Sequence, residues 1–402
     1  MYQIRSLPSS TRAQAAIAEP HDILDRIRLL RSRRVGPATW RRLMNEHGCA
    51  ADAVAALSEV ARAAGIDGYA PCPPAIAERE WRDGSRAGAV PLFCDDQRYP
   101  PALAAIGDAP PLLWVRGDVA ALSRPAVAII GARAASSLGE RMARRMGTAL
   151  SERGVCIVSG LARGIDAAAH AAALDAGGRT VAVLAGGVDV VYPAENAALA
   201  ARIAAVGGAV ISEAPIGRTA RAADFPRRNR IVSGLSRGVV VVEAALKSGS
   251  LSTARLAAEQ GREVMAVPGH PFEARAAGPN ALIRDGATLV MGPDQVVEAL
   301  GGTDALRIAP PDSAAPVRPP VRDATDGIRP SPPVASAKPS RDVDAGADDV
   351  QERIRSILQS PMDEDGLIRA VGLAPAALAP VLLAMELEGR VERLPGARLV
   401  AR

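Results

Sequence analysis

A strand-to-helix turn at residues 245–253 carries residue types suited to binding phosphate. Its sequence, ALKSGSLST, places Lys247 among small and hydroxyl residues at the expected start of a helix. Backbone N–H groups at a helix start attract anions, and an ammonium group beside them adds a full positive charge. The chain has 48 Lys+Arg residues, but its only lysines are Lys247 and Lys338. Lys247 is therefore the single lysine of the part expected to fold, and we interpret the turn as an anion site.

Small residues recur wherever an expected strand ends. In an open parallel sheet, ligands bind beyond the carboxyl ends of the strands. The segments at those ends are GAR (131–133), SGLARG (159–164), AGG (185–187), SE (212–213), EAALKSGS (243–250) and PG (268–269). Their small residues leave backbone N–H groups accessible, and Arg133, Arg163, Arg230 and Lys247 add positive charge. The pattern predicts a phosphate-binding edge.

The elements that must position these residues alternate regularly over residues 125–302. Short apolar strands are expected at 126–130, 155–160, 180–187, 209–213, 239–242, 263–269 and 287–291, with amphipathic helices between most of them and a short helix at 225–230. Runs of this length, rich in β-branched residues, are typical of central parallel strands. The fold class is therefore α/β, with a Rossmann-like doubly wound sheet of about seven mostly parallel strands.

Five further segments flank this core. We expect a disordered tail at 1–20, a helical module similar to SAM or helix-hairpin-helix domains at 21–68, a connecting segment with edge strands at 69–124, a disordered linker at 303–348 and a winged-helix domain at 349–402. The helical module could contact a nucleic-acid backbone or another protein surface. The presumptive recognition helix of the winged helix, PAALAPVLLAMELEG, has no lysine or arginine, which favours a protein contact over a DNA contact.

The overall composition is mildly basic, with a net charge of +4 and a pI near 9.1, which permits an anionic partner without requiring one. No stretch approaches the 18 apolar residues of a membrane span. The four cysteines form no CxxC pair and the four histidines are scattered. We therefore expect a cytoplasmic protein with free thiols and with no metal or cofactor.

Three enzymatic interpretations fit the sequence poorly. The turn at 131–134 lacks the G-x-G-x-x-G of a dinucleotide site, and Lys247 lacks the preceding glycines of a P-loop. His170 lies inside an expected helix, where a structural role is favoured over a catalytic one. Glu213 and Glu243 end strands, and we expect them to orient Arg230 or Lys247 by ion pairing rather than to catalyse.

Several long motifs together resemble the DNA-processing protein A (DprA/Smf) family. They are GARAAS (131–136), IVSGLARGIDAAAH (157–170), VAVLAGGVDVVYPAEN (181–196), FPRRNRIVSGLS (225–236), ALKSGSLSTA (245–254) and VPG (267–269). The resemblance extends to the helical module and the winged helix. It implies a homodimeric, non-enzymatic protein of natural transformation that binds single-stranded DNA, protects incoming strands and helps load the RecA recombinase onto them.

Placed on this sequence, the resemblance and the strand ends give a set of expected DNA-binding residues. They are Arg133, Ser136, Ser159, Gly160, Arg163, Gly186, Gly187, Asn229, Arg230, Lys247, Ser248, Gly249 and Ser250. The first turn departs from the family pattern, because GAR lacks the hydroxyl residue usual between the glycine and the arginine. The only aromatic side chains of the core are Tyr192, Phe225 and Phe272, so we expect affinity to depend mostly on phosphate contacts and to fall with salt.

An alternative is a nucleotide-cleaving enzyme on a related core, such as a phosphoribohydrolase. Glu243 or Glu213 would then lie near the sugar and the KSGS turn would hold the phosphate. Those enzymes carry a GGxGT-x-x-E turn, and no such acid follows Gly249 here. An enzyme of this kind would bind a mononucleotide, whereas a strand binder requires several linked phosphates.

Overall fold

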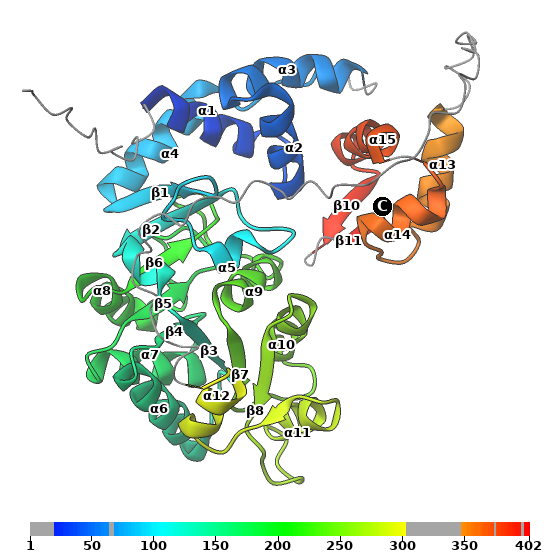
Figure 1. Cartoon of the computed structure of the whole chain (residues 1–402). Coiled ribbons are helices and arrows are strands. Elements are labelled where there is room, and N and C mark those ends of the chain that lie inside the picture. The colour runs from blue at the N-terminus through cyan, green and yellow to red at the C-terminus, as the bar shows by residue number, and fades with distance from the viewer. Residues whose placement is uncertain (1–19, 64–67, 303–346, 374, 395–397) are drawn as a thin grey trace, which may run out of the picture.

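A nine-stranded sheet forms the centre of the molecule (Figure 1). The structure is a computed structural model that describes residues 20–63, 68–302, 347–373, 375–394 and 398–402. The strand order is β1-β2-β6-β5-β4-β3-β7-β8-β9. The strands are β1 (Ala89–Phe93), β2 (Leu112–Gly117), β3 (Ala126–Ile130), β4 (Cys156–Ser159), β5 (Thr180–Val183), β6 (Ala209–Ser212), β7 (Gly238–Val241), β8 (Glu263–Ala266) and β9 (Thr288–Leu289).

The seven strands β3 to β9 pair in parallel, as the sequence predicts. From β3 the chain builds the sheet in one direction through β4, β5 and β6, and then in the other through β7, β8 and β9. The strand order therefore reverses between β3 and β7. A doubly wound sheet opens a crevice at this switch point, beyond the carboxyl ends of its strands.

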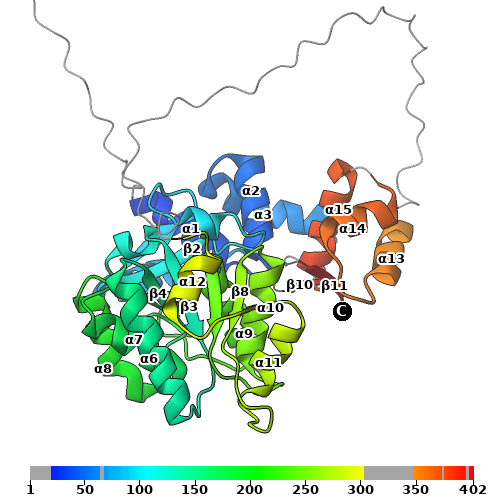
Figure 2. The ribbon, with the colours of Figure 1, turned by 60° about the horizontal axis from the view of Figure 1, so that its bottom comes forward.

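Helices cover both faces of the parallel strands, as Figure 2 shows. Helices α6, α7 and α12 pack on one face and α9 and α10 on the other. Val127 and Ile129 of β3 point to the first layer, and Ala128 and Ile130 to the second. Burial on both faces explains why β3 is an unbroken apolar run. The helices are α6 (Ser137–Glu152), α7 (Ile165–Asp175), α8 (Ala197–Ala205), α9 (Asp224–Leu235), α10 (Gly249–Glu259), α11 (Ala277–Arg284) and α12 (Pro293–Ala299), with short 3₁₀ turns at Val119–Ser123 and Ala194–Asn196.

An N-terminal helical unit lies at the β1 end of the sheet. It consists of α1 (Pro20–Arg31), α2 (Pro37–His47), α3 (Ala50–Ala63) and α4 (Pro74–Arg86), and the short α5 (Pro101–Ala104) follows β1. Helix α4 falls in the segment for which the sequence suggested only extended structure. Of the edge strands expected in the 69–124 segment, β1 is one, whereas β2 is an interior strand because β1 lies outside it; both run antiparallel to their neighbours.

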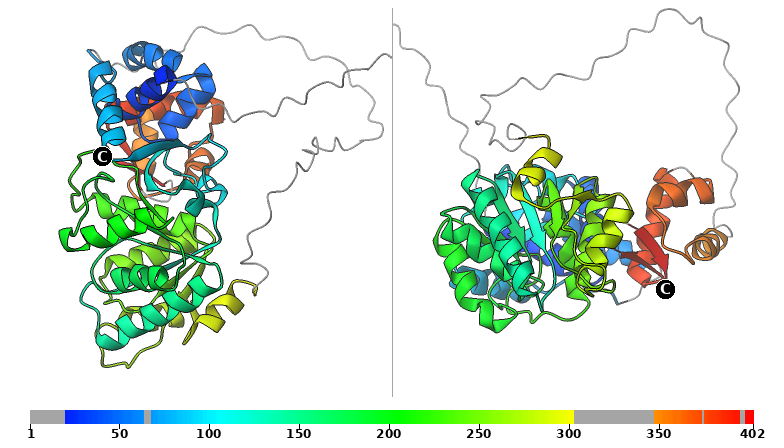
Figure 3. Two further views of the ribbon diagram at one scale, coloured as in Figure 1. Left: turned by 90° about the vertical axis from the view of Figure 1, so that its left-hand side faces the viewer. Right: turned by 90° about the horizontal axis from the view of Figure 1, so that it is seen from below.

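The C-terminal residues fold as a winged-helix unit of α13 (Ala347–Ile357), α14 (Glu364–Val371), α15 (Pro375–Glu388), β10 (Val391–Leu394) and β11 (Arg398–Ala401). This agrees with the predicted winged-helix domain, of which residues 374 and 395–397 lie outside the described residues. Figures 1 and 3 show the unit beside α2 rather than separate from the rest. The predicted tail at 1–20 and linker at 303–348 lie almost wholly outside the described residues.

Helix α9 is longer than the sequence suggested. The expected short helix at 225–230 continues to Leu235, and Ile231, Val232 and Leu235 join the core beneath the sheet. Across the described ranges, none of the helices has the length and apolar character needed to span a bilayer.

A buried polar cluster connects the N-terminal helical unit to the sheet. The carboxylate of Glu80 on α4 is 7% exposed and accepts hydrogen bonds from Arg31 Nε and Nη2 at 2.9 and 2.7 Å. The indole Nε1 of Trp114 on β2 also donates to Glu80, at 2.9 Å. Three elements far apart in the sequence therefore meet on one carboxylate.

We predict that Glu80→Ala lowers the free energy of unfolding by about 3 kcal/mol, because it leaves a buried guanidinium and an indole N–H without their acceptor. Chemical denaturation measures this change. Asp83→Ala on the same helix is the control, since its partner Arg86 is 73% exposed, and we expect a change within about 0.5 kcal/mol. Equal effects of the two substitutions would contradict the role of Glu80.

Candidate nucleic-acid interface

The loops that follow β3, β4 and β7 meet at the switch point of the sheet. The hydroxyl of Ser250, in the first turn of α10, donates to the carbonyl of Gly131 after β3 at 2.8 Å. Ser136 caps α6 by accepting from the N–H of Gly139 at 3.0 Å. Glu243, at the end of β7, accepts from the N–H and the hydroxyl of Ser136 at 2.9 and 2.5 Å. These contacts fix two predicted phosphate-binding loops next to each other.

Arg133 lies exposed on the loop after β3 and stacks on Phe225, one member of an aromatic pair. Its guanidinium carbon is 5.2 Å from the ring centroid of Phe225, at the start of α9. Tyr192 meets Phe225 edge to face, with ring centroids 5.9 Å apart at 64°, and Tyr192 is 53% exposed. This arrangement combines a cation with accessible aromatic surface.

A small cavity of about 30 Å³ opens between Arg133 and the aromatic pair. We call it the Arg133 pocket. It is lined by Arg133, Gly160, Ala162, Arg163, Tyr192, Pro193, Phe225 and Arg228. Arg163 is 59% exposed and forms an ion pair with Glu195, which is 52% exposed. Such an exposed pair contributes little stability, so the guanidinium can exchange its partner for a phosphate.

Arg228 forms the buried wall of the Arg133 pocket. It is 7% exposed, and its Nη1 donates to the carbonyl of Val183 at the end of β5 at 2.6 Å. A Cβ built on Gly160 would lie 1.9 Å from this Nη1, so only glycine lets the loop after β4 cross the guanidinium. Burial lowers the pKa of Arg228, and the nearby charge of Asp166 opposes that shift.

Asp166 supports the same loop from the first turn of α7. Its Oδ2 accepts from the N–H groups of Gly160 and Ala162 at 3.1 and 3.3 Å. Burial raises the pKa of Asp166, while the charge of Arg228 and these hydrogen bonds lower it. The loop after β4 is therefore held between an internal carboxylate and an internal guanidinium.

The start of α10 presents Lys247 to solvent. Ser248 caps the helix, and its hydroxyl accepts from the N–H of Ser250 at 3.2 Å. A Cβ built on Gly249 has no neighbour within 4 Å among the described residues, so this turn opens outward. The exposed lysine and the open turn agree with an anion site, although the hydroxyls of Ser248 and Ser250 already take part in the fold.

Comparison with known proteins identifies the family of the chain. Residues 91–301 match the family described as DNA recombination-mediator protein A, which covers more than half of the chain. The chain belongs to that family. Residues 20–82 match its N-terminal helix-hairpin-helix domain and residues 334–397 its winged-helix domain. The DprA/Smf resemblance inferred from the motifs is thereby confirmed.

Individual relatives give the same result. The chain is 50% identical to protein Smf of Escherichia coli over 206 residues, which are 51% of this chain and 55% of that protein. The alignment thus spans about half the length of that relative. Protein Smf of Synechocystis is 35% identical over 319 residues, which are 76% of this chain and 79% of the relative. The X-ray structure of DprA from Streptococcus pneumoniae superposes with a TM-score of 0.56 and 34% identity, covering 68% of this chain and 95% of that one.

Two side chains expected to contact DNA lie inside this family's core fold instead. Arg230 is 4% exposed and donates from Nη1 and Nη2 to the two carboxylate oxygens of Glu213 at 2.8 and 2.7 Å. Although burial alone lowers the pKa of Arg230, the charge of Glu213 raises it. Ser159 is fully buried and donates to the carbonyl of Ile129 at 2.7 Å. We assign both residues to the support of the site.

The remaining expected residues also divide into buried residues that shape the loops and accessible cations. Gly186 and Gly187 are buried against the 215–220 loop, where an added Cβ would lie within 2.7 Å of a backbone oxygen in each case. Asn229 is 9% exposed and donates to the carbonyl of Gly249 at 3.4 Å. These three residues shape the loops. The structure therefore keeps Arg133, Arg163 and Lys247 as the accessible cations of the expected set.

Arg228 was not among the predicted site residues. A signal was available, because Arg228 lies four residues after Asp224 and four before Val232, so all three lie on one face of a helix. The two carboxylates weighed as catalysts have other roles. Glu213 pairs with Arg230, as expected, whereas Glu243 binds Ser136 rather than an arginine or a lysine.

His170 is fully buried in α7, in agreement with its expected structural role. The hydroxyl of Thr180 donates to the carbonyl of Ile157 at 2.6 Å and lies 2.6 Å from Nδ1 of His170. A hydroxyl has one proton to give, so Nδ1–H is the donor to Thr180. Burial lowers the pKa of His170 to about 3.

We predict an acid-sensitive contribution of His170 to stability. Its pKa is lower in the folded state than in the unfolded state, where it is about 6.5, so protons bind the unfolded chain preferentially. The contribution of neutral His170 to the free energy of unfolding is complete above pH 6.5 and is lost as the pH falls toward 3. In urea denaturation, the unfolding free energy of the wild type should fall by about 2 kcal/mol more between pH 7 and 5 than that of His170→Asn. Parallel pH profiles would contradict this.

Proposed function

We propose that the chain binds single-stranded DNA at the Arg133 pocket and the adjoining start of α10, without cleaving it. The observation that carries the proposal is the stacking of Arg133 on Phe225 beside the exposed ring of Tyr192. Proteins that bind single strands combine cations that follow the backbone with aromatic rings on which bases stack. Arg163 and Lys247 extend the cationic surface along the same edge of the sheet.

Family membership supports this proposal, since the matched family is described as a recombination mediator. On that ground we further propose that the protein acts in DNA processing during transformation, as a homodimer that protects strands and helps load the RecA recombinase. The carboxylates argue against the alternative of a nucleotide-cleaving enzyme. Glu213 is occupied by Arg230 and Glu243 by Ser136, so neither is poised for a substrate.

The first test of the proposal is fluorescence anisotropy of labelled oligo-dT and of a matched duplex over a salt series. We expect preference for the single strand. Arg133→Ala and Lys247→Ala should each weaken binding by about tenfold at low salt and make the salt dependence shallower by about 0.7 in log–log slope, because each removes one phosphate contact.

Arg202→Ala is the matched control, because this 46% exposed arginine of α8 lies toward the amino ends of the strands, at the edge opposite the site. The affinity of the Arg202→Ala variant for oligo-dT should equal that of the wild type. If all three variants bind alike, the site assignment is wrong. Release of a free base from nucleoside monophosphates by the wild type would favour the enzyme instead.

The aromatic pair should contribute through stacking rather than charge. We expect Tyr192→Ala to weaken oligo-dT binding by about 1–3 kcal/mol with little change in the salt slope, whereas Tyr192→Phe retains the affinity. The same anisotropy assay measures both quantities. A loss in Tyr192→Phe equal to that in Tyr192→Ala would assign the effect to the hydroxyl and remove the stacking argument.

A further inference from the structure

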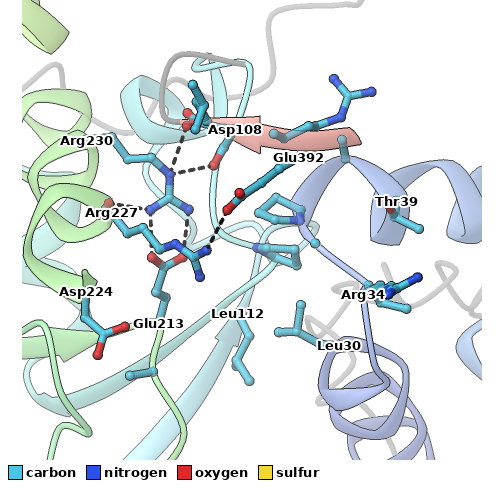
Figure 4. A pocket seen from close by; sticks show the side chains of 18 of the residues that line it. Leu30, Arg34, Thr39, Asp108, Leu112, Glu213, Asp224, Arg227, Arg230 and Glu392 are labelled. Carbon is cyan, nitrogen blue, oxygen red and sulfur yellow. Dashed lines mark hydrogen bonds and ion pairs between the residues drawn. The ribbon is translucent and has the colours of Figure 1, made fainter. Parts of the chain in front are cut away.

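A second, larger cleft lies between the three parts of the described chain. It has a volume of about 610 Å³ and is lined by the N-terminal helical unit, the carboxyl end of the sheet, α9 and, from the winged-helix unit, α15, β10 and Arg402. Figure 4 shows its charged lining, in which Arg34 and Thr39 come from the first unit, Arg227 from α9 and Glu392 from β10. We call it the inter-unit cleft.

The winged-helix unit is attached to one side of this cleft through Glu386. This carboxylate on α15 is 8% exposed and accepts from the hydroxyl of Thr39 at 2.9 Å and from Nε of Arg393 at 2.7 Å. Arg34 lies against Gly389, the residue that follows α15, since a Cβ built on this glycine would be 2.7 Å from Nη2 of Arg34. A cation at the carboxyl end of a helix is favourable.

The ion pairs that join the winged-helix unit to α9 and α10 are longer and more exposed. Arg398 on β11 lies 3.5 Å from Glu259 on α10, and the second pair borders the cleft itself. Glu392 on β10 faces Arg227 on α9, with 3.6 Å between Oε1 and Nη2. The side chain of Arg227 is 60% exposed, so a surface pair of this kind contributes little. Glu392 has a second partner, Arg402, in its own unit. The carboxylate therefore keeps a counter-charge when Arg227 leaves it.

Arg227 adjoins the Arg133 pocket. It follows Phe225 by two residues in the first turns of α9, and its neighbour Arg228 lines both the Arg133 pocket and the inter-unit cleft. One buried side chain thus stands between the two cavities. Phe225, which Arg133 contacts, and Arg227 both lie in the first turn of α9, so a strand bound at Arg133 has Arg227 as a further cation nearby.

We propose that Arg227 binds a phosphate of the same single strand and that Glu392 occupies this position when DNA is absent. The inference rests on the proposed function. A phosphate and the Glu392 carboxylate are both anions, so they cannot share Arg227 without repulsion. Binding of a strand that reaches the inter-unit cleft thus separates β10 from α9, and the winged-helix unit serves as an internal competitor rather than as a DNA reader.

The test is a double-mutant cycle in the full-length protein, with oligo-dT affinity as the readout. Glu392→Gln removes the competing charge and should tighten binding about two- to fivefold. The same substitution in the Arg227→Ala background should leave affinity unchanged, because the cation on which it acts is gone. Glu352→Gln is the control, since this glutamate of α13 is 73% exposed and pairs within its own helix.

The outcomes separate the two proposals. If Arg133→Ala weakens binding but Glu392→Gln has no effect, or has the same effect with and without Arg227, the present inference is overturned and the proposed function stands. An equal effect in both backgrounds would assign the gain to net charge or to Arg402. If Arg133→Ala does not weaken binding, the proposed function itself fails. All substituted residues are at least partly exposed, so thermal unfolding should verify that each variant remains folded.

Discussion

The buried guanidinium of Arg228 constrains the whole carboxyl edge of the sheet. Burying a charge is costly unless fixed partners surround it, and here the partners come from separate elements. The carbonyl of Val183 ends β5, Gly160 follows β4 and Asp166 begins α7. The loops around Arg228 can therefore adopt few other arrangements. Because Arg228 itself lies on α9, this constraint also fixes where Phe225 meets Arg133.

The charges of this edge divide into an internal set and an external set. Inside, Arg230 is matched by Glu213, and Ser136 by Glu243. Outside, Arg133 and Lys247 face solvent. The two glutamates that follow β6 and β7 are thus engaged with other parts of the fold, while cations and an aromatic ring remain accessible at the same edge.

Much of the fold was predictable from the sequence, because parallel strands buried on both faces appear as short, continuous apolar runs. The runs at 126–130 and 239–242 are short, apolar and rich in β-branched residues, and they lie next to each other as β3 and β7. The loop positions of Arg133, Arg163 and Lys247 followed from the same pattern. Antiparallel β1 was missed, because its sequence AVPLF contains a proline and its pairing with β2 depends on packing beneath α4.

The less predictable part of the site concerns the direction of polar side chains. The stretch FPRRNR contains three arginines in four positions, and sequence alone does not say which one faces inward. Helix α9 is buried on nearly all sides after its first turn. The direction of each arginine side chain therefore depends on which carboxylate or carbonyl acceptors the neighbouring elements place against that position. The side chain of Arg227 faces Glu392 of the winged-helix unit. The guanidinium of Arg228 packs against Gly160, and that of Arg230 binds the carboxylate of Glu213.

The hydrogen bond between Trp114 and Glu80 bears on how this chain can be divided. The matched segments 20–82 and 91–301 suggest two separable modules. However, the acceptor of an indole in the second segment lies on a helix of the first, and Ala77 and Ile27 pack in one apolar cluster with Trp114. A fragment beginning at residue 91 would lose that cover over β2. The boundary between the two matched segments therefore does not coincide with a boundary between hydrophobic cores, since residues from both segments share one apolar cluster.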